Sequence, residues 1–406
     1  MCFVTVPHPL GMISKEEVNA KVDAAFDDIV KAATAWTPSK EKQDAQVKPY
    51  PAKRFKFSGT YADVNDMFQK RKCSLSLPIV PPTVDKVAAM LKGTKRNPAE
   101  VLWVVPPRQG MLTVELVAAL GVMAGAKPEH MPLLIATVEA MADPVAAWRG
   151  PTTTTAATVP VFFISGPIIE KLKLNPGTGT AGGENPVTNA LGYFVNLVGD
   201  VVGGSVPPNF DKSTHGSSAD LVAMVFTENA KENPWKTTYA EEAGFKPSDS
   251  IVTHFSAYLG NANIDHDSKT GQRLLTTLST GLLGSASGLA SCLADYDATY
   301  AINNKVSFAF IVLCPEHAAT IAKDFPDQRA ARDFMRETAA MPYKFYSQET
   351  CVPGKDFGPY DENTFIPRFK KTESIKFFVS GGPGKQSQIW VPFPQVFKPV
   401  SKKIAE

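Results

Sequence analysis

Apolar and polar positions follow two patterns along this chain, and the two patterns alternate. Short continuous apolar runs, rich in β-branched and aromatic residues, are typical of buried strands and occupy residues 2–6, 101–105, 159–165, 221–226, 250–259, 306–313 and 374–380. Longer stretches with apolar residues at every third or fourth position predict helices at about residues 14–33, 62–72, 84–93, 112–125, 133–143, 168–175, 187–204, 273–283, 315–325 and 328–340. Strands that alternate with helices predict an α/β fold, with mixed or parallel sheets flanked by helices.

The composition divides the chain into four parts. Residues 37–60 are polar, basic and proline-bearing, which is typical of a surface arm or linker rather than of a packed element. We therefore predict a two-lobed molecule with these parts: a tail at 1–36, a basic linker or arm at 37–72, a first α/β lobe at 73–205, and a second α/β lobe with a C-terminal extension at 206–406.

A short internal repeat suggests that the two lobes are pseudo-equivalent halves. Residues 128–130 and residues 315–317 both read PEH, and both open predicted helices behind an apolar segment. If the halves are duplicates, a cleft between them is the default place for a site. The alternative is that proline followed by glutamate suits the first turn of any helix.

The stretch from Val159 to Gly204 is organised around a glycine-rich loop, PGTGTAGGENP. Glycine has no Cβ, so its backbone N–H can approach a ligand closely, and the helix predicted after the loop would point its N-terminus at an anion. The predicted substrate- or anion-binding residues of this stretch are Gly177, Gly179, Gly182, Thr188 and Asn189. The letters GTGTAG match a dinucleotide fingerprint, but the loop neither follows its strand directly nor opens the helix, which weighs against a dinucleotide. A flexible connector is the alternative.

Polar residues also follow two of the predicted strands. Arg108 lies in a predicted strand-to-helix turn after residues 101–105, and Glu228 and Asn229 follow residues 221–226. Ligand sites in open α/β sheets lie at the carboxyl ends of strands. We therefore predict that Arg108 binds a carboxylate or phosphate, that Asn229 contacts the substrate, and that Glu228 transfers protons. A structural pairing of Arg108 with a helix end is the alternative.

The densest polar group is NANIDHDS, which follows the strand predicted at residues 250–259. In it, Asn261 and Asn263 are predicted to bind substrate, and Asp265 and His266 to be catalytic. A histidine beside a carboxylate can act as a general base, and the same pair can ligate a divalent metal. A hydrogen-bonded loop is the alternative. No cofactor is firmly implied, and a divalent metal is the one candidate.

Charge, hydropathy and cysteine content narrow the class of protein. The net charge is +2, so nothing global indicates nucleic-acid binding. No apolar run reaches the ~18 residues that a membrane-spanning helix needs, so we expect no membrane partner. Five scattered cysteines without a CxxC pair favour free thiols in a reducing compartment, and hence the cytoplasm. Cys314 precedes a predicted helix N-terminus, which favours a thiolate, although buried inert cysteine is the commoner case.

A series of motifs resembles a known family. In chain order the motifs are VPHPLG, LPIVPPT, GTKRNPAEVLWVVPPRQG, VMAGAKPEHMPLLIATVEAM, ISGPIIEKLKLN, GTGTAGGEN, FTENAKENPW, NANIDHDS, CPEHAATIAKD and VSGGPGK. They resemble a bacterial family whose members carry an upstream domain with a Cys/selenocysteine-Gly-Ser-Cys motif, the UGSC proteins. The resemblance covers most of the chain outside residues 37–70 and 340–370, and residues 1–34 resemble the tail of the upstream domain.

The thiol motif itself does not occur in this chain. The resemblance then implies one of two arrangements. Either the thiol domain is a separate small subunit, of roughly a hundred residues, that adds a sheet to the strand at residues 2–6, or the reading frame starts after an in-frame selenocysteine codon. The first arrangement makes a UGSC-type thiol or selenol subunit the expected partner in a hetero-oligomer.

These patterns and the resemblance together favour an enzyme, or the large subunit of one, that acts on a small anionic substrate by thiol- or selenol-based redox or lyase chemistry. One alternative is a metal-dependent lyase or hydrolase that uses Asp265, His266 and Glu228, and another is a non-catalytic assembly subunit. The first hypothesis requires that Arg108, Glu228 and His266 converge with the glycine-rich loop around one pocket.

Overall fold

The computed structural model describes residues 4, 6, 13–35, 50–206, 214–258, 260–284, 308–345, 361–393, 396 and 398–405. The chain forms two compact units, Met1–Lys48 and Pro49–Glu406. Of the strand predicted at residues 2–6, only residues 4 and 6 are described, and neither is assigned to a strand. The arm residues 37–49 lie outside the described residues. No helix in the described ranges is both long and apolar enough to cross a membrane.

The first unit contains the helix α1 (Lys15–Thr34), close to the predicted 14–33. The Ser14 hydroxyl accepts a hydrogen bond from the Glu17 N–H, and the Glu17 carboxylate accepts one from the Ser14 N–H, so a capping box begins the helix. The described residues of this unit leave the apolar stripe of α1 uncovered, because Phe26 is 55% exposed and Val22 and Val30 are exposed beside it. The helix thus has the amphipathic form of an element that packs on another surface.

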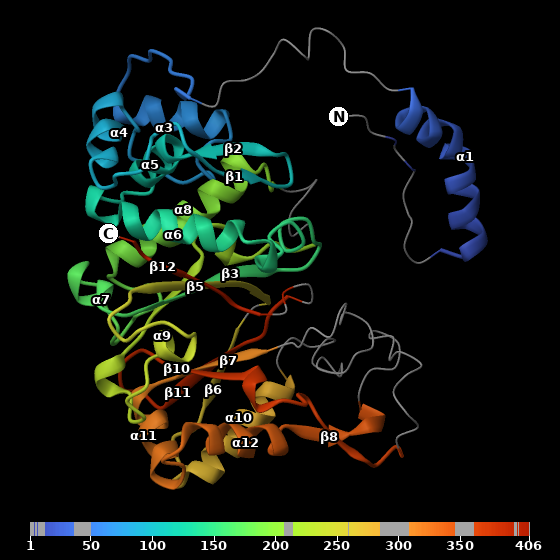
Figure 1. Ribbon diagram of the computed structural model, residues 1–406, viewed down its shortest axis with the longest axis vertical. Coiled ribbons are helices and arrows are strands. Elements are labelled where there is room, and N and C mark those ends of the chain that lie inside the picture. The colour runs from blue at the N-terminus through green and yellow to red at the C-terminus, as the bar shows by residue number, and fades with distance from the viewer. Residues whose placement is uncertain are drawn as a thin grey trace. The chain divides into compact units, whose positions relative to one another are not determined.

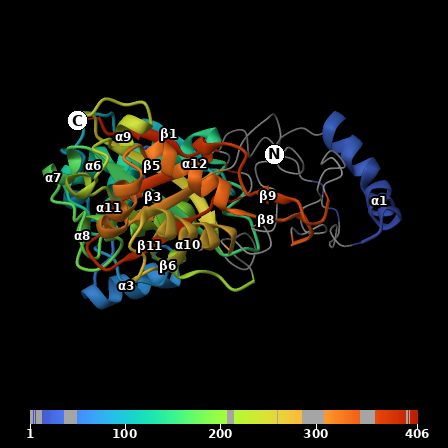
Figure 2. The ribbon, with the colours of Figure 1, turned by 90° about the horizontal axis from the view of Figure 1, so that it is seen from below.

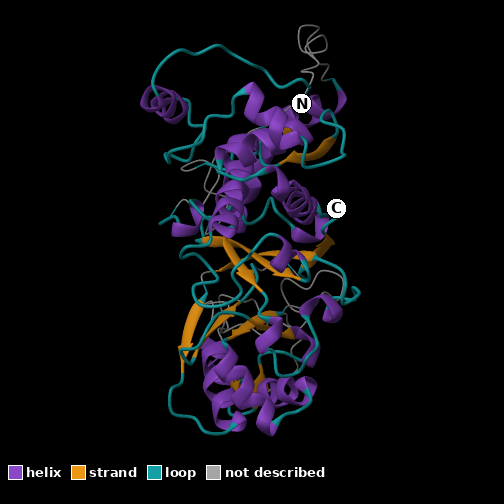
Figure 3. Ribbon diagram, turned by 90° about the vertical axis from the view of Figure 1, so that its left-hand side faces the viewer, coloured by secondary structure: helices purple, strands orange, loops and turns teal. Residues whose placement is uncertain are grey.

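The second unit is built on two four-stranded sheets. Sheet 1 has the order β12 (Val400–Lys403), β5 (Ile251–Tyr258), β3 (Thr158–Ser165), β4 (Met224–Thr227). Sheet 2 has the order β10 (Ile375–Val379), β7 (Ala309–Leu313), β11 (Gln386–Trp390), β6 (Asn261–Ile264). The sheets lie in the middle of the unit with helices beyond each of them (Figures 1 and 3). The predicted α/β class, with mixed sheets flanked by helices, is confirmed.

Phenylalanine side chains fill the space between the two sheets. Phe163 of β3 stacks on Phe310 of β7 with ring centroids 4.4 Å apart. The same ring lies 5.4, 5.9 and 4.7 Å from the rings of Phe226, Phe255 and Phe378. All five rings are buried. Because successive strand residues point to opposite faces, the intervening positions face the helices instead.

Helices cover the outer face of each sheet. On sheet 1 these are α6 (Met131–Ala142) and α8 (Pro186–Leu197), and beyond them lie α5 (Val114–Met123), α3 (Tyr61–Lys70), α4 (Val84–Leu91) and the hairpin β1 (Val101–Val105)–β2 (Gly110–Thr113) (Figure 1). On sheet 2 they are α10 (Gly271–Gly284), α11 (Pro315–Asp324) and α12 (Gln328–Thr338), seen from outside in Figure 2. The smaller elements are α7 (Ile168–Lys171), α9 (Tyr239–Glu242), β8 (Ala340–Pro342) and β9 (Phe365–Pro367).

The two sheets have the same connections. In sheet 1 the central strand β3 follows α6, runs parallel to β4 and antiparallel to β5. In sheet 2 the central strand β7 follows α10, runs parallel to β10 and antiparallel to β11. Each half then gives its last strand to the other sheet, β6 beside β11 and β12 beside β5. This is the topology of two pseudo-equivalent halves, and it makes each sheet depend on both.

The PEH repeat is not the trace of this duplication. Residues 128–130 precede α6 and the central strand of their half, whereas residues 315–317 follow β7 and open α11. The two motifs therefore occupy non-equivalent places and share only the chemistry of a helix start. The predicted lobe boundary at residues 205 and 206 falls between α8 and β4, which belong to the same half.

Two predicted turns have a different form in the structure. Residues 106–109 connect β1 to the antiparallel strand β2, so they form a hairpin turn, and the prediction of a strand-to-helix turn there is wrong. The helix starts only at Val114, where the Thr113 hydroxyl accepts from the Leu116 N–H. Likewise Asn261–Ile264, predicted as a loop, pair with β11 as the edge strand of sheet 2.

Candidate functional site

The carboxyl ends of two parallel strand pairs, one from each sheet, meet in the second unit. Just past the pair β3–β4, the Glu228 backbone forms an isolated antiparallel bridge with Ser380, which follows β10. The Asn229 N–H donates to the carbonyl of Val379 at 2.8 Å, and the Ser380 N–H donates to the carbonyl of Leu313 at 3.0 Å. The ends of β4, β7 and β10 are thus tied together, at the kind of edge where open α/β sheets bind ligands.

The glycine-rich loop lies against these strand ends. The Thr180 hydroxyl accepts from the Thr227 N–H at 3.2 Å, and the Ser380 hydroxyl donates to the Thr227 carbonyl at 2.7 Å. The Gly381 N–H donates to the Pro176 carbonyl at 2.8 Å. The resulting group of Ser165, Thr180, Thr227, Glu228 and Ser380, all of them buried, is called the strand-end cluster below.

Glycine is required where the loop meets the strand end. A Cβ at Gly382 would overlap the Thr178 hydroxyl oxygen and crowd the Thr178 backbone nitrogen. Inside the loop, Gly182 has a φ of +108°, a backbone conformation that residues other than glycine rarely adopt. The glycines therefore let the loop approach β10 closely. The sequence suggested such a close approach for a ligand, but here it is made to another part of the protein.

Glu228 is the most unusual group in the cluster. Its side chain is 2% exposed, and its Oε1 accepts from the Tyr239 N–H at 2.6 Å. Burial raises the pKa of Glu228 to about 7, and the Tyr239 N–H and the nearby Ser165 hydroxyl only partly oppose that rise. The Ser165 hydroxyl lies close but makes no hydrogen bond of ordinary geometry. A carboxyl with a pKa near neutrality can both accept and release a proton at physiological pH.

Several buried polar atoms near the strand ends have no hydrogen-bond partner among the described residues. They are Ser165 Oγ, Thr227 Oγ1, Glu228 Oε2 and Asn185 Nδ2. Most buried polar side-chain atoms in folded proteins are paired, so a group of unpaired ones calls for a water or ligand that pairs them. Ser165 directly follows Ile164, which pairs with Thr227, so Ser165 and Glu228 are neighbours across β3 and β4.

Asn185 belongs to the same region because of the direction of α8. The Ala223 N–H, just before β4, donates to the Gly192 carbonyl at 3.1 Å, and the Asn196 amide donates to the Ala219 carbonyl at 2.6 Å. The later half of α8 therefore lies beside the start of β4. Its N-terminus, at Asn185, consequently points toward the carboxyl ends of the strands, where its N–H groups favour negative charge.

The remaining predicted residues of this region hold the loop in place. The Asn189 amide donates to the Gly183 carbonyl at 3.1 Å, and the Thr188 hydroxyl donates to the Asn185 carbonyl at 3.3 Å. The Asn229 amide donates to the Gly381 carbonyl at 3.1 Å, and its Oδ1 accepts from the Glu232 N–H at 3.3 Å. Of the loop glycines, Gly177 donates its N–H to Asn175 Oδ1 at 2.9 Å, and Gly179 has a φ of +73°. The structure thus brings Glu228 and Asn229 together with the loop.

The structure does not bring Asp265 and His266 to the strand-end cluster. Both follow β6, which lies at the edge of sheet 2 opposite β10. Three strand spacings of ~4.8 Å separate those edges by roughly 14 Å. His266 is exposed, and its carbonyl accepts from the Lys385 ammonium at 3.0 Å. The Asn261 and Asn263 amides donate to the carbonyls of Gly281 and Asn261, on the side of α10.

The carboxylate of Asp265 is occupied by local hydrogen bonds. It accepts from the Thr277 hydroxyl at 2.6 Å and from the Ser268 hydroxyl and N–H at 2.7 and 2.8 Å. Burial alone would raise the pKa of Asp265, but these bonds outweigh it and lower the pKa to about 2. Asp265 therefore ties the loop to α10, which is the hydrogen-bonded alternative considered for this segment.

This role predicts a stability effect. Asp265→Asn is expected to lower the free energy of unfolding by about 1–2 kcal/mol at pH 7, because an amide cannot accept all three bonds. The contribution should be present above pH 4 and lost as the pH falls through about 2, the folded pKa. Urea titration at pH 7 and pH 2.5 measures it. Asp267→Asn, an exposed neighbour, serves as control, and equal stability of D265N and wild type at pH 7 would contradict the assignment.

Arg108 also lies elsewhere. Its N–H donates to the Gly203 carbonyl at 2.9 Å, and its side chain packs so closely on Gly204 that a Cβ there would overlap it. The hairpin that carries Arg108 is separated from sheet 1 by α6 and α8 (Figure 1). The expected meeting of Arg108, Glu228 and His266 around one pocket does not occur. The sequence signal was misleading because β1 is followed by a hairpin turn and belongs to a separate two-stranded sheet, so Arg108 does not follow a strand of sheet 1 or sheet 2.

Sequence reasoning missed Ser165, Thr180 and Ser380 as members of the cluster. A signal was present, because Ser165 and Ser380 both end an apolar run and both precede glycine. Cys314, considered for its helix N-terminus, follows Leu313 and is buried beside Ser380, since Leu313 pairs with Val379. In the described ranges no three His, Cys, Asp or Glu side chains are grouped so that they could hold a metal ion.

Comparison of the chain with protein-family models, with curated proteins and with solved structures gave no match. The resemblance to the UGSC proteins therefore stays a prediction. What the protein does has to be argued from the geometry of the strand-end cluster.

Proposed function

We propose that this protein is an enzyme in which Glu228 transfers a proton to and from a small anionic substrate bound at the strand-end cluster. The observation that carries the proposal is the buried Glu228 carboxyl, with a pKa raised to about 7 and one oxygen without a partner in the described residues. A group of this kind costs stability, and such groups are concentrated at catalytic sites.

The surroundings of Glu228 favour a substrate with a carboxylate or similar anion. The N-terminus of α8 is directed toward the strand ends, and the Asn185 amide nitrogen is buried without a partner in the described part of the chain. The hydroxyls of Ser165 and Thr227 supply neutral donors nearby. Abstraction of a proton next to a carboxylate, as in lyases and isomerases, is the reaction class that this combination serves best.

The metal-dependent alternative through Asp265, His266 and Glu228 has no geometric support. The Asp265 carboxylate is already occupied by Thr277 and Ser268, and Glu228 is placed at the opposite edge of sheet 2. A thiol- or selenol-bearing partner remains part of our proposal, on the strength of the UGSC resemblance and of the uncovered apolar stripe of α1. Free thiols at Cys73 and Cys314 support a reducing, cytoplasmic location.

The test uses exchange of substrate protons with heavy water. The purified protein is incubated in D₂O with a panel of small hydroxy-, oxo- and amino-carboxylates, and deuterium uptake is followed by proton NMR. We expect one class to exchange, at a rate that rises with pH through about 7 as Glu228 becomes a base. Glu228→Gln should slow the exchange by roughly 10²–10⁴-fold.

Glu170→Gln is the matched control, because Glu170 is exposed and its ion pair is with the exposed Lys231. It should exchange substrate protons at the wild-type rate. Exchange that survives E228Q unchanged, or the absence of exchange across the whole panel with and without a co-purified partner, would rule the proposal out.

A further inference from the structure

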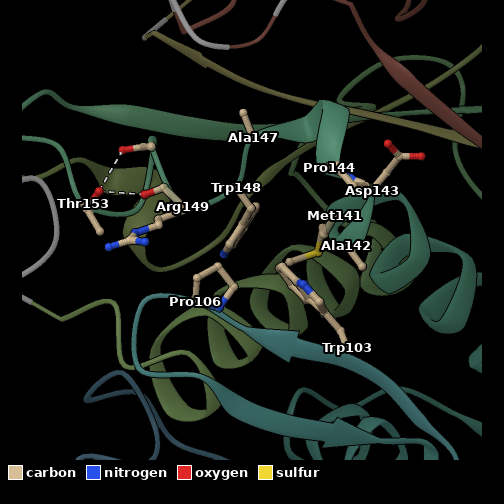
Figure 4. A pocket seen from close by; sticks show the side chains of 11 residues that line it. Trp103, Pro106, Met141, Ala142, Asp143, Pro144, Ala147, Trp148, Arg149 and Thr153 are labelled. Carbon is tan, nitrogen blue, oxygen red and sulfur yellow. Dashed lines mark hydrogen bonds between the residues drawn. The ribbon is translucent and has the colours of Figure 1, made fainter. Parts of the chain in front are cut away.

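A separate cavity lies on the outer face of sheet 1. Its wall residue Trp148 packs against His254 of β5, with ring centroids 5.7 Å apart, and His254 pairs with Phe162 of β3. The cavity measures about 480 Å³ and is lined by Trp103, Pro106, Met141, Ala142, Asp143, Pro144, Ala147, Trp148, Arg149, Gly150 and Thr153 (Figure 4). Most of these residues come from the end of α6 and from the segment that leads into β3. The volume of the cavity is within the range of small-molecule sites.

The walls of the cavity are flat and apolar. Trp103 of β1 and Trp148 meet edge to face, with ring centroids 5.8 Å apart and planes at 74°. Figure 4 shows both rings, together with Pro106 and the Met141 sulfur, bordering a common space. Aromatic rings and a thioether favour a planar aromatic ligand, which can lie against one tryptophan and meet the edge of the other.

Two groups at the cavity favour an acceptor with negative charge. Trp148 is 5% exposed, and its indole N–H has no hydrogen-bond partner among the described residues. A buried donor left unpaired is costly, so an acceptor that reaches it is stabilised. Arg149 is exposed at the cavity and forms no ion pair within the described ranges. The one lining carboxylate, Asp143, is already paired with the Lys402 ammonium at 2.8 Å.

We propose that this cavity binds a small planar aromatic carboxylate. The ring lies against the tryptophans, and the carboxylate accepts the Trp148 indole N–H and faces the Arg149 guanidinium. The positive charge of Arg149 at the cavity disfavours the competing reading, an organic cation held over the tryptophan faces. This site is distinct from the one at Glu228, because none of the residues that line the cavity belongs to the strand-end cluster.

The experiment follows the indole N–H signals of ¹⁵N-tryptophan-labelled protein during titration with 2-naphthoate. The signals of Trp148 and Trp103, assigned with Phe variants, are expected to shift, whereas that of Trp235 stays, because its N–H already donates to the Phe325 carbonyl at 3.0 Å. The neutral isostere 2-naphthalenemethanol is expected to bind about tenfold more weakly. Equal binding of the alcohol, or Trp148 and Trp103 signals that do not move, would overturn the proposal.

Two variants separate the hydrogen bond from the fold. Trp148→Phe keeps an aromatic wall and removes the N–H, so 2-naphthoate should bind about tenfold more weakly and the alcohol nearly as before. Trp235→Phe is the matched control and should bind both compounds as wild type does. Should Trp148→Phe unfold the protein, the exposed Arg149→Gln still decides the matter. It should weaken 2-naphthoate about threefold to tenfold without affecting the alcohol, and equal affinity in R149Q and wild type would count against a carboxylate.

Discussion

Replacement of Phe163 with alanine is expected to lower the free energy of unfolding by about 4 kcal/mol. Phe163 is the ring on which the inter-sheet core is centred, since it contacts Phe310 at 4.4 Å and Phe378 at 4.7 Å between ring centroids. Its removal leaves a cavity that the facing strands cannot close, because their backbone positions are fixed by hydrogen bonds in both sheets.

Urea denaturation followed by far-ultraviolet circular dichroism measures this loss. Phe345→Ala is the matched control, because the Phe345 side chain is 63% exposed and its loss should change stability by less than about 0.5 kcal/mol. If F163A and F345A lose similar amounts, the two sheets do not share the core described here. A transition that becomes biphasic in F163A would also contradict a single core between the halves.

Glu228→Gln is expected to make the protein more stable at pH 8, by about 3 kcal/mol. Burial raises the pKa of Glu228 from 4.5 to about 7 in the folded state. Between pH 4.5 and about 7 the folded protein holds a proton on Glu228 that the unfolded chain has lost. The free energy of unfolding therefore falls as the pH rises through 7, because the buried carboxyl becomes charged. The neutral amide does not ionise, and the variant escapes this loss.

Stability of wild type and E228Q should therefore be compared at pH 5 and pH 8 by urea titration. The gain in the variant should be below about 1 kcal/mol at pH 5 and largest at pH 8. Glu170→Gln, on the surface, should show no such pH dependence. A variant that is less stable than wild type at pH 8 would show that Glu228 is a structural carboxylate, and it would remove the basis of the proposed chemistry.

Local pattern was sufficient for most elements that lie in the core. The run at residues 159–165 became β3, and the capped amphipathic stretch at 14–33 became α1, because apolar periodicity reports directly on burial. Among the strands that were missed, β11 and β12 are short and carry polar residues such as Gln386 and Lys402. Their place in the sheets comes from pairing with distant strands, which no local pattern encodes.

The candidate site was found only in part, for a similar reason. Glu228 was selected because it ends a strand, and its burial then gave it a perturbed pKa. Asp265 looked equally promising because hydroxyl-rich loops and catalytic loops use the same residue types, and only the contacts with Thr277 and Ser268 distinguish them. Ser380 was invisible as a partner of Glu228 because 152 positions separate them along the chain, and only the meeting of two sheets joins them.

The exchange of β6 and β12 between the halves has consequences for how this chain could have evolved and for the effect of cleaving its backbone. A protein consisting of one half alone would expose an unpaired strand edge, and two such copies would cover each other's edges by the same exchange. The present chain is arranged like such a swapped pair joined end to end. A nick in the connector between β6 and α10 would therefore leave two fragments that still need one another to complete their sheets.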